Sequence, residues 1–149
     1  MKKQAYMIIT MMVLLTVAGV STAQAQTSGN TEVRADIPFA FSVGNKAMPA
    51  GEYALRCTNP ASDLKVLELR SRDGRASVMV RTNSVIGRTP EVAKLVFSRY
   101  GDQYFFAQAW LPADNIGMQV PQSRSEKRIA RELAAARKSK ELVAINARR

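Results

Sequence analysis

The chain has 149 residues and a formal net charge of +10, with 22 Lys and Arg against 12 Asp and Glu, no histidine and one cysteine. Without histidine it has no Ser-His or Cys-His nucleophile pair, no imidazole metal ligand and no imidazole proton shuttle at neutral pH. One cysteine forms neither an internal disulfide nor a thiolate metal cluster. The sequence therefore predicts a protein that is not an enzyme and that uses no metal and no cofactor.

Residues 1–25 show the order of charge, apolar run and small residues that is typical of a secretory signal peptide. Lys2 and Lys3 precede an apolar run over 5–20, and a small-x-small cleavage site ends at Ala25. The run is shorter than the roughly 20 residues of a membrane-spanning helix, so we expect no transmembrane span after processing. The processed chain is expected to be periplasmic or secreted and to begin with a flexible segment over 26–31.

Residues 32–112 are predicted to form an antiparallel β domain, because apolar and polar residues alternate along them. The first alternation runs over 33–43. Pro38 cannot donate to a ladder, so this strand is expected to lie at an edge or to break in two there. A second alternating strand over 52–57 turns Cys57 inward, where we expect a buried and unreactive thiol.

A tight hairpin is predicted at Asp73-Gly74, because a two-residue type I′ turn needs positive φ at both central residues and this dipeptide tolerates it. The turn sets the register of the two strands, with Leu67 opposite Val80 and Leu69 opposite Val78. These four aliphatic side chains are therefore expected to share the buried face.

A second hairpin is predicted at Gly101-Asp102, which joins a strand over 94–100 to one over 103–111. Both faces of this hairpin are apolar, so we expect it at the centre of the domain, covered on both sides. In a regular register Trp110 lies on the same face as Phe97.

The aromatic residues of this hairpin allow two interpretations. Packing inside a core is the first, since large rings are what a sandwich interior requires. The alternative is a platform on which rings stack against a sugar or a peptide, as in a carbohydrate-binding accessory domain. The candidate ligand-binding residues of this alternative are Arg99, Tyr100, Tyr104 and Trp110.

The pattern changes near the C-terminus. Proline, glycine and an Asp-Asn pair predict a linker over 113–122. Ser123 and Glu126 then form a capping box, and the run of Ala, Arg, Lys, Glu and Leu that follows predicts a helix over 123–145. Residues 146–149 are expected to fray.

Most of the basic charge lies in this predicted helix. The candidate polyanion-binding residues are Arg124, Lys127, Arg128, Arg131, Arg137, Lys138 and Lys140. On a helix over 123–145 several of them point in different directions and no Trp or Phe anchors the apolar stripe, so a solvated helix that serves solubility is the alternative. Because export is expected, the expected partner is an anionic envelope polymer, a lipid headgroup or an acidic protein rather than nucleic acid.

Carboxylates are the remaining candidates for acid–base chemistry, since a glycosidase needs only two of them about 5 to 10 Å apart. Glu52, Glu68, Asp73 and Asp102 fall on outward strand positions or in turns. Acidic side chains in such places are usually solvated surface or turn formers. No catalytic residue is therefore predicted.

The stretch from Pro38 to Tyr53 has the pattern P-F-x-F-x-V-G-x-K-x-x-P-A-G-x-Y. It resembles the opening of a group of small, uncharacterised exported bacterial proteins. Those proteins also share an Arg-Tyr-Gly-Asp hairpin, present here at 99–102, and a basic C-terminal segment. The resemblance implies export and a β domain, and it implies no functional residue.

Taken together, these patterns predict a mainly β protein, an antiparallel β-sandwich or barrel-like domain followed by a C-terminal α-helix. Its expected role is that of an exported, non-enzymatic interaction or structural module of the cell envelope.

Overall fold

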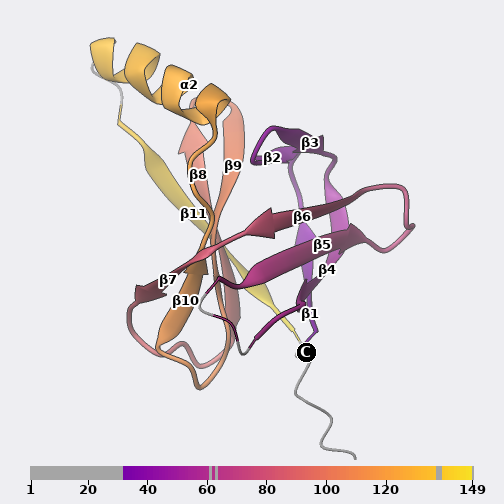
Figure 1. Ribbon diagram of the computed structural model, residues 1–149. Coiled ribbons are helices and arrows are strands. Elements are labelled where there is room, and N and C mark those ends of the chain that lie inside the picture. Colours follow the sequence, from indigo (N-terminus) through magenta and orange to yellow (C-terminus); the bar gives the residue numbers. More distant parts are fainter. Residues whose placement is uncertain (1–31, 61, 63, 137–138, 149) are drawn as a thin grey trace, which may run out of the picture.

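The computed structural model describes residues 32–148 apart from 61, 63, 137 and 138 (Figure 1). The signal peptide predicted over 1–25 and the flexible segment predicted over 26–31 therefore lie outside the described residues. The described chain is mainly β, as predicted, with a helix near its C-terminal end.

The elements follow one another in chain order as eleven strands and a single helix within the described residues. The first seven strands are β1 (Val33–Ile37), β2 (Phe41–Val43), β3 (Lys46–Met48), β4 (Gly51–Cys57), β5 (Val66–Ser71), β6 (Ser77–Arg81) and β7 (Asn83–Ile86). The remaining elements are β8 (Ala93–Tyr100), β9 (Gln103–Trp110), β10 (Ile116–Gln119), α2 (Arg124–Ala135) and β11 (Glu141–Ala147).

The strands form two sheets with a common core between them. The first sheet has the order β1-β4-β5-β6, and the second has the order β11-β8-β9-β10-β7. All of these neighbours are antiparallel. The short β2 pairs with β3 and, in parallel, with β9. Figure 1 shows the two layers, with α2 at the end of the second sheet where β8 turns into β9.

The two sheets are joined at both margins, which makes the sandwich barrel-like. At one margin β6 continues into β7 through Thr82, a buried residue whose hydroxyl donates to the Lys65 carbonyl at 2.9 Å. At the other margin Arg34 of β1 and Arg148 after β11 exchange two backbone hydrogen bonds, of 2.6 and 2.7 Å. The predicted fold class is confirmed.

Phe97 of β8 lies at the centre of the core. Its ring meets those of Phe39, Phe41 and Phe106 edge to face, at centroid distances of 5.2, 5.3 and 5.5 Å. Aromatic pairs prefer this geometry, and each ring also removes a large apolar area from water. Cys57 is buried in the same core, as predicted.

Pro38 breaks the first alternating stretch, as predicted. β1 ends at Ile37 and β2 begins at Phe41, because proline has no N–H for the ladder. Within the break, Phe39 stacks its ring on Tyr104 with the centroids 3.9 Å apart.

The register predicted for the first hairpin is correct, but the turn is of another type. Both predicted leucine–valine pairs form. Gly74 has a positive φ of 72° whereas Asp73 does not, and the Gly74 N–H donates to the Ser71 carbonyl at 2.9 Å. Asp73 stabilises the turn through its side chain, which accepts from the Arg75 N–H at 3.0 Å.

The second hairpin turns where predicted, but a β-bulge changes the register of its far half. Phe97 pairs with Phe106 as expected, whereas Lys94 pairs with Trp110. Ala107 is the extra residue of β9, and it reverses the alternation beyond it. Trp110 therefore leaves the face of Phe97, and its predicted position was wrong.

Trp110 lies on the outer face of the second sheet because two glycines make room for it. A Cβ placed on Gly87 or on Gly117 would collide with carbons of the indole. The ring therefore rests on bare backbone and is only 9% exposed. Its N–H donates to Gln108 Oε1 at 3.0 Å.

The linker predicted over 113–122 contains a strand. β10 pairs with both β9 and β7, so the second sheet continues beyond the hairpin. Gly117, which suggested a loop in the sequence, lies in this strand and is needed there because the Trp110 ring covers it.

The helix predicted over 123–145 ends at Ala135, and residues 141–147 form β11 instead. The strand pairs along its whole length with the edge of β8. Helix preference is a weak local effect, and a complete ladder to a neighbouring strand outweighs it.

The frayed tail predicted over 146–149 was also wrong for most of its residues. Asn146 and Ala147 belong to β11, and Ala147 is buried. Arg148 bonds to β1, and residue 149 lies outside the described residues.

The helix α2 has 12 residues, many of them charged. Neither it nor any other helical segment in the described part of the chain has the length and apolar character that crossing a bilayer requires.

Candidate functional site

The four candidate ligand-binding residues of the second hairpin do not share a surface. Tyr100 and Trp110 belong to the outer face of the second sheet, where they are 5% and 9% exposed. Tyr104 stacks on Phe39 at the opposite face, and the Arg99 guanidinium lies 5.6 Å from the centroid of the Tyr104 ring. The alternation of the strands and the bulge thus separate these residues into two pairs.

Four of the candidate polyanion-binding residues lie on one side of α2, and we call them the basic face: Arg124, Lys127, Arg128 and Arg131. Their i, i+3, i+4, i+7 spacing places them within about 100° around the helix axis. All four are exposed. Glu132 borders this face, with its Oε1 3.9 Å from Arg128 Nε. A helix over 123–145 was expected to point its cations in several directions. The observed helix ends at Ala135, and its four cations lie on one side.

The other three candidates are not part of the described helix. Lys140 is exposed and directly precedes β11. Arg137 and Lys138 lie outside the described residues. Among the described residues, the basic face therefore contains four of the seven candidates.

The first turn of α2 is held against the end of the second sheet, beside the turn from β8 to β9 (Figure 1). Ser123 caps the helix, since its Oγ accepts from the Glu126 N–H at 3.1 Å, which confirms one half of the predicted capping box. The Glu126 carboxylate turns inward and the residue is only 6% exposed. Ile129 and Leu133 are half-buried on the same side.

Glu126 connects the helix to β8. Its Oε1 accepts hydrogen bonds from the Tyr100 hydroxyl at 3.3 Å and from Gln122 Nε2 at 3.4 Å. Burial raises the pKa of Tyr100, and the charge of Glu126 raises it further. The phenol therefore remains a donor at neutral pH. The sequence analysis assigned Glu126 only to the helix cap, and no local pattern signals its contact with Tyr100.

A cavity of about 360 Å³ lies beneath the first turn of α2, and we call it the helix cavity. It is lined by Ser98, Ala107, Gln108, Gln119, Val120, Gln122, Glu126, Lys127, Lys140 and Leu142. The lining comes from three strands of the second sheet, the helix and the beginning of β11, so only the folded chain brings these residues together.

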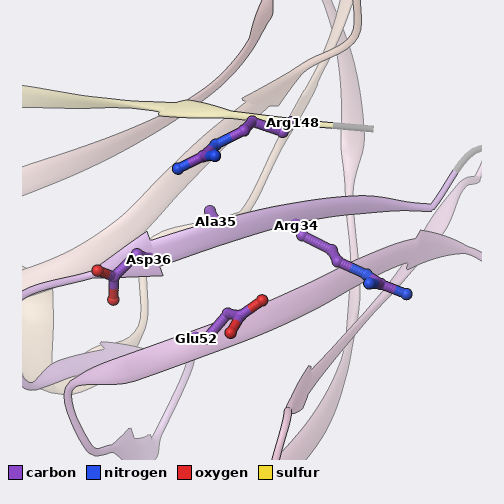
Figure 2. A pocket seen from close by; sticks show the side chains of 5 residues that line it. All are labelled: Arg34, Ala35, Asp36, Glu52 and Arg148. Atoms are coloured by element: carbon purple, nitrogen blue, oxygen red, sulfur yellow. The ribbon is translucent and has the colours of Figure 1, made fainter.

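A second cavity, of about 420 Å³, lies on the outer face of the first sheet beside the margin where β1 meets the end of β11. Figure 2 shows Arg148 extending above Ala35 and two carboxylates below it. These are Asp36 and Glu52, which are direct cross-strand neighbours. The sequence analysis considered Glu52 but not Asp36, because the pairing of these two residues follows only from the register of β1 and β4.

This carboxylate pair has the character of a solvated charged surface. Asp36 is exposed, the Glu52 side chain is 38% exposed, and Glu52 Oε2 lies 2.7 Å from Arg72 Nη1. General acids usually owe their protonation to burial or to a close, uncompensated like charge. Among the described residues no three His, Cys, Asp or Glu side chains gather into a potential metal site.

Comparison of the chain with models of protein families, with curated proteins and with solved structures finds no match. The function is therefore inferred from the surfaces described above.

Proposed function

We propose that the processed chain is an exported, non-enzymatic interaction module that binds an anionic polymer of the cell envelope through the basic face of α2. The observation that carries the proposal is the alignment of four cations on the exposed side of a helix whose other side is docked. Aligned charges add their fields, so a chain of negative groups meets several cations at once.

The basic face favours a polymer over a lipid surface. An interfacial helix inserts an apolar side into the bilayer, but Ile129 and Leu133 are half-buried and share the side of α2 on which Glu126 bonds to Tyr100 of β8. Three of the four cations are arginines, whose planar guanidinium groups bind carboxylate and phosphate in a bidentate manner. The ion pair between Arg128 and Glu132 is exposed on both sides, so it competes only weakly with a partner.

The non-enzymatic part of the proposal is supported by the chemistry of the side chains. The chain has no histidine, and its one cysteine is buried in the core. The neighbouring carboxylates Asp36 and Glu52 are accessible to water, and Glu52 is paired with Arg72.

The test is a titration of the mature protein with heparin and with polyphosphate at several salt concentrations. Replacing Arg124, Arg128 and Arg131 together by Gln should weaken binding at least about tenfold and flatten its salt dependence, because fewer ion contacts remain to be screened. The matched control replaces Arg56, Arg70 and Arg81 by Gln. These are exposed arginines of the first sheet, so the control removes the same charge from another surface and should retain most of the affinity.

An equal loss in both triple variants would mean that net charge, not the basic face, determines binding, and the proposal would be wrong. Tighter binding to vesicles of anionic lipid, or to an acidic protein, than to either polymer would overturn the choice of a polymer.

Export is tested separately by N-terminal sequencing of the protein from its native cell. We expect a first residue of Gln26 and recovery outside the cytoplasm. A cytoplasmic chain that retains residues 1–25 would contradict this part of the proposal.

A further inference from the structure

The helix cavity contains a buried hydroxyl that lacks a partner. Ser98 is 0% exposed, and its Oγ makes no hydrogen bond among the described residues. Its side chain lies on the same face of β8 as that of Tyr100, two residues further along the strand. Buried polar groups are nearly always bonded, so the Ser98 hydroxyl, which solvent does not reach, is an unsatisfied group in the wall of the cavity.

Glu126 contributes a buried carboxylate with spare acceptor capacity. Both hydrogen bonds that the described residues make to this carboxylate go to Oε1, and both come from neutral groups. Within the described part of the chain no Lys or Arg forms an ion pair with it. A buried carboxylate without a cation is unfavourable, and a positive group of a ligand at Oε2 would supply one.

Two lysines complete the lining of the cavity. Lys127 reaches it from the helix and Lys140 from the segment before β11. Neither lies within ion-pair distance of Glu126, so the cavity offers a negative group and a positive pair at separate positions. A ligand with one charge of each sign matches this arrangement.

We propose that the helix cavity binds a small zwitterion, an amino acid or a dipeptide, with its ammonium group on Glu126 and its carboxylate toward Lys127 and Lys140. The site lies under the first turn of α2 and shares Lys127 with the basic face. Glu126 and Lys140 belong to the cavity and not to the basic face, so this second binding function can be tested apart from polymer binding.

The remaining lining agrees with a peptide ligand. Gln108, Gln119 and Gln122 each offer an amide that can both donate to and accept from a peptide bond. Ala107, Val120 and Leu142 provide apolar contact for small side chains. The volume of about 360 Å³ lies near the lower end of the range of roughly 300 to 1,000 Å³ that is usual for ligand pockets, which favours a small ligand.

The first experiment is a calorimetric titration of the mature protein with alanyl-alanine and two blocked forms of it. N-acetyl-alanyl-alanine lacks the ammonium group, and alanyl-alanine amide lacks the carboxylate. We expect alanyl-alanine to bind and each blocked form to bind at least about tenfold more weakly, because each loses one charged contact. Absence of alanyl-alanine binding, or equal binding of the three probes, would overturn the proposal.

The second experiment uses Glu126→Gln, a change that nearly preserves side-chain volume. It should reduce alanyl-alanine affinity at least about tenfold while heparin binding stays unchanged, whereas the control Arg131→Gln should leave dipeptide affinity unchanged. An unchanged affinity of the Glu126→Gln variant for alanyl-alanine would refute the site. If a variant does not fold, the comparison of the three probes on the unaltered protein still decides.

Discussion

Single residues determine how the helix is held against the sheet. Tyr100 and Glu126 belong to elements far apart in the chain, yet they meet in a buried hydrogen bond. Tyr53 makes a comparable contact on the other side of the core, where its hydroxyl donates to the Pro49 carbonyl at 2.6 Å. Burial raises the pKa of both phenols, with added effects from Glu126 on Tyr100 and from Asp73 on Tyr53.

These two tyrosines predict a loss of stability at alkaline pH. A raised pKa in the folded state means that the unfolded chain loses its phenolic proton first, at the ordinary value of 10.0. The stabilisation is therefore complete below pH 10.0 and disappears as the pH rises through the folded-state pKa. Urea unfolding at a series of pH values should show a free energy of unfolding that falls above pH 10.

The contribution of Tyr100 can be isolated by two variants. Tyr100→Phe should remove one late-titrating phenol from the absorbance titration at alkaline pH and should make the fall in stability less steep. Glu126→Gln should let Tyr100 ionise at a lower pH, because the opposing charge is gone. An unchanged titration in Tyr100→Phe would show that another group is responsible.

Among the elements, β11 differs most from what its sequence suggests. Its residues Glu141, Leu142 and Ala144 are compatible with a helix, but Val143 and Ile145 are β-branched and are half-buried on one face. The strand occupies the edge of the second sheet beside β8, and its last residues reach β1. It is thus part of the β domain and not an extension of the helix.

We predict different effects of two neighbouring substitutions in β11. Ile145→Asn should lower the free energy of unfolding by about 1–3 kcal/mol, because it places a polar amide against the core. The control Ala144→Asn introduces the same side chain on the exposed face and should change stability by less than about 0.5 kcal/mol. Denaturant unfolding measures both values, and equal effects would mean that the alternation of β11 is incorrect.

The sequence predicted those elements whose signals are local. Alternation and turn residues located β1, β2, β4, β5, β6, β8 and β9, but not the short strands β3 and β7. Pro38 located the first break, and the dipeptide at 73–74 set the register of its hairpin. The bulge at Ala107 and the strand β11 depend on pairing with residues distant in sequence, which a local pattern does not contain.

The candidate site was only partly predictable for the same reason. The four basic residues of α2 are close in sequence, so the sequence identified them as candidates. It did not locate the C-terminal end of the helix. The helix cavity combines Ser98 of β8, Gln122 of the loop and Glu126 of the helix, and no pattern in the chain indicates that they meet.

For the whole molecule, the closure of the two sheets into a barrel-like body depends on a short stretch of backbone. Arg34 and Arg148 exchange two hydrogen bonds and so connect the first strand to the end of the last one. The Arg148 side chain, in contrast, lies over the exposed cavity of Figure 2. The backbone and the side chain of one residue therefore have separable roles.

Arg148→Pro and Arg148→Ala distinguish these roles. Proline removes the N–H that donates to the Arg34 carbonyl and should lower the free energy of unfolding by about 1–2 kcal/mol. Alanine keeps that N–H and should cost less than about 0.5 kcal/mol. Hydrogen exchange of the β1 amides should accelerate only in the proline variant. Acceleration in both would assign the closure to the side chain.

Along the chain, α2 is connected at both ends to strands of the second sheet, and this affects how the protein responds to a pulling force. The chain enters the helix a few residues after β10 and leaves it a few residues before β11, and these strands flank the β8–β9 hairpin on either side. A tensile load on the helix is therefore shared by two anchor points. Once its two connections are fully extended, pulling the helix further requires rupture of β10 or β11 from the sheet, whereas a tether at a chain end would load one anchor alone.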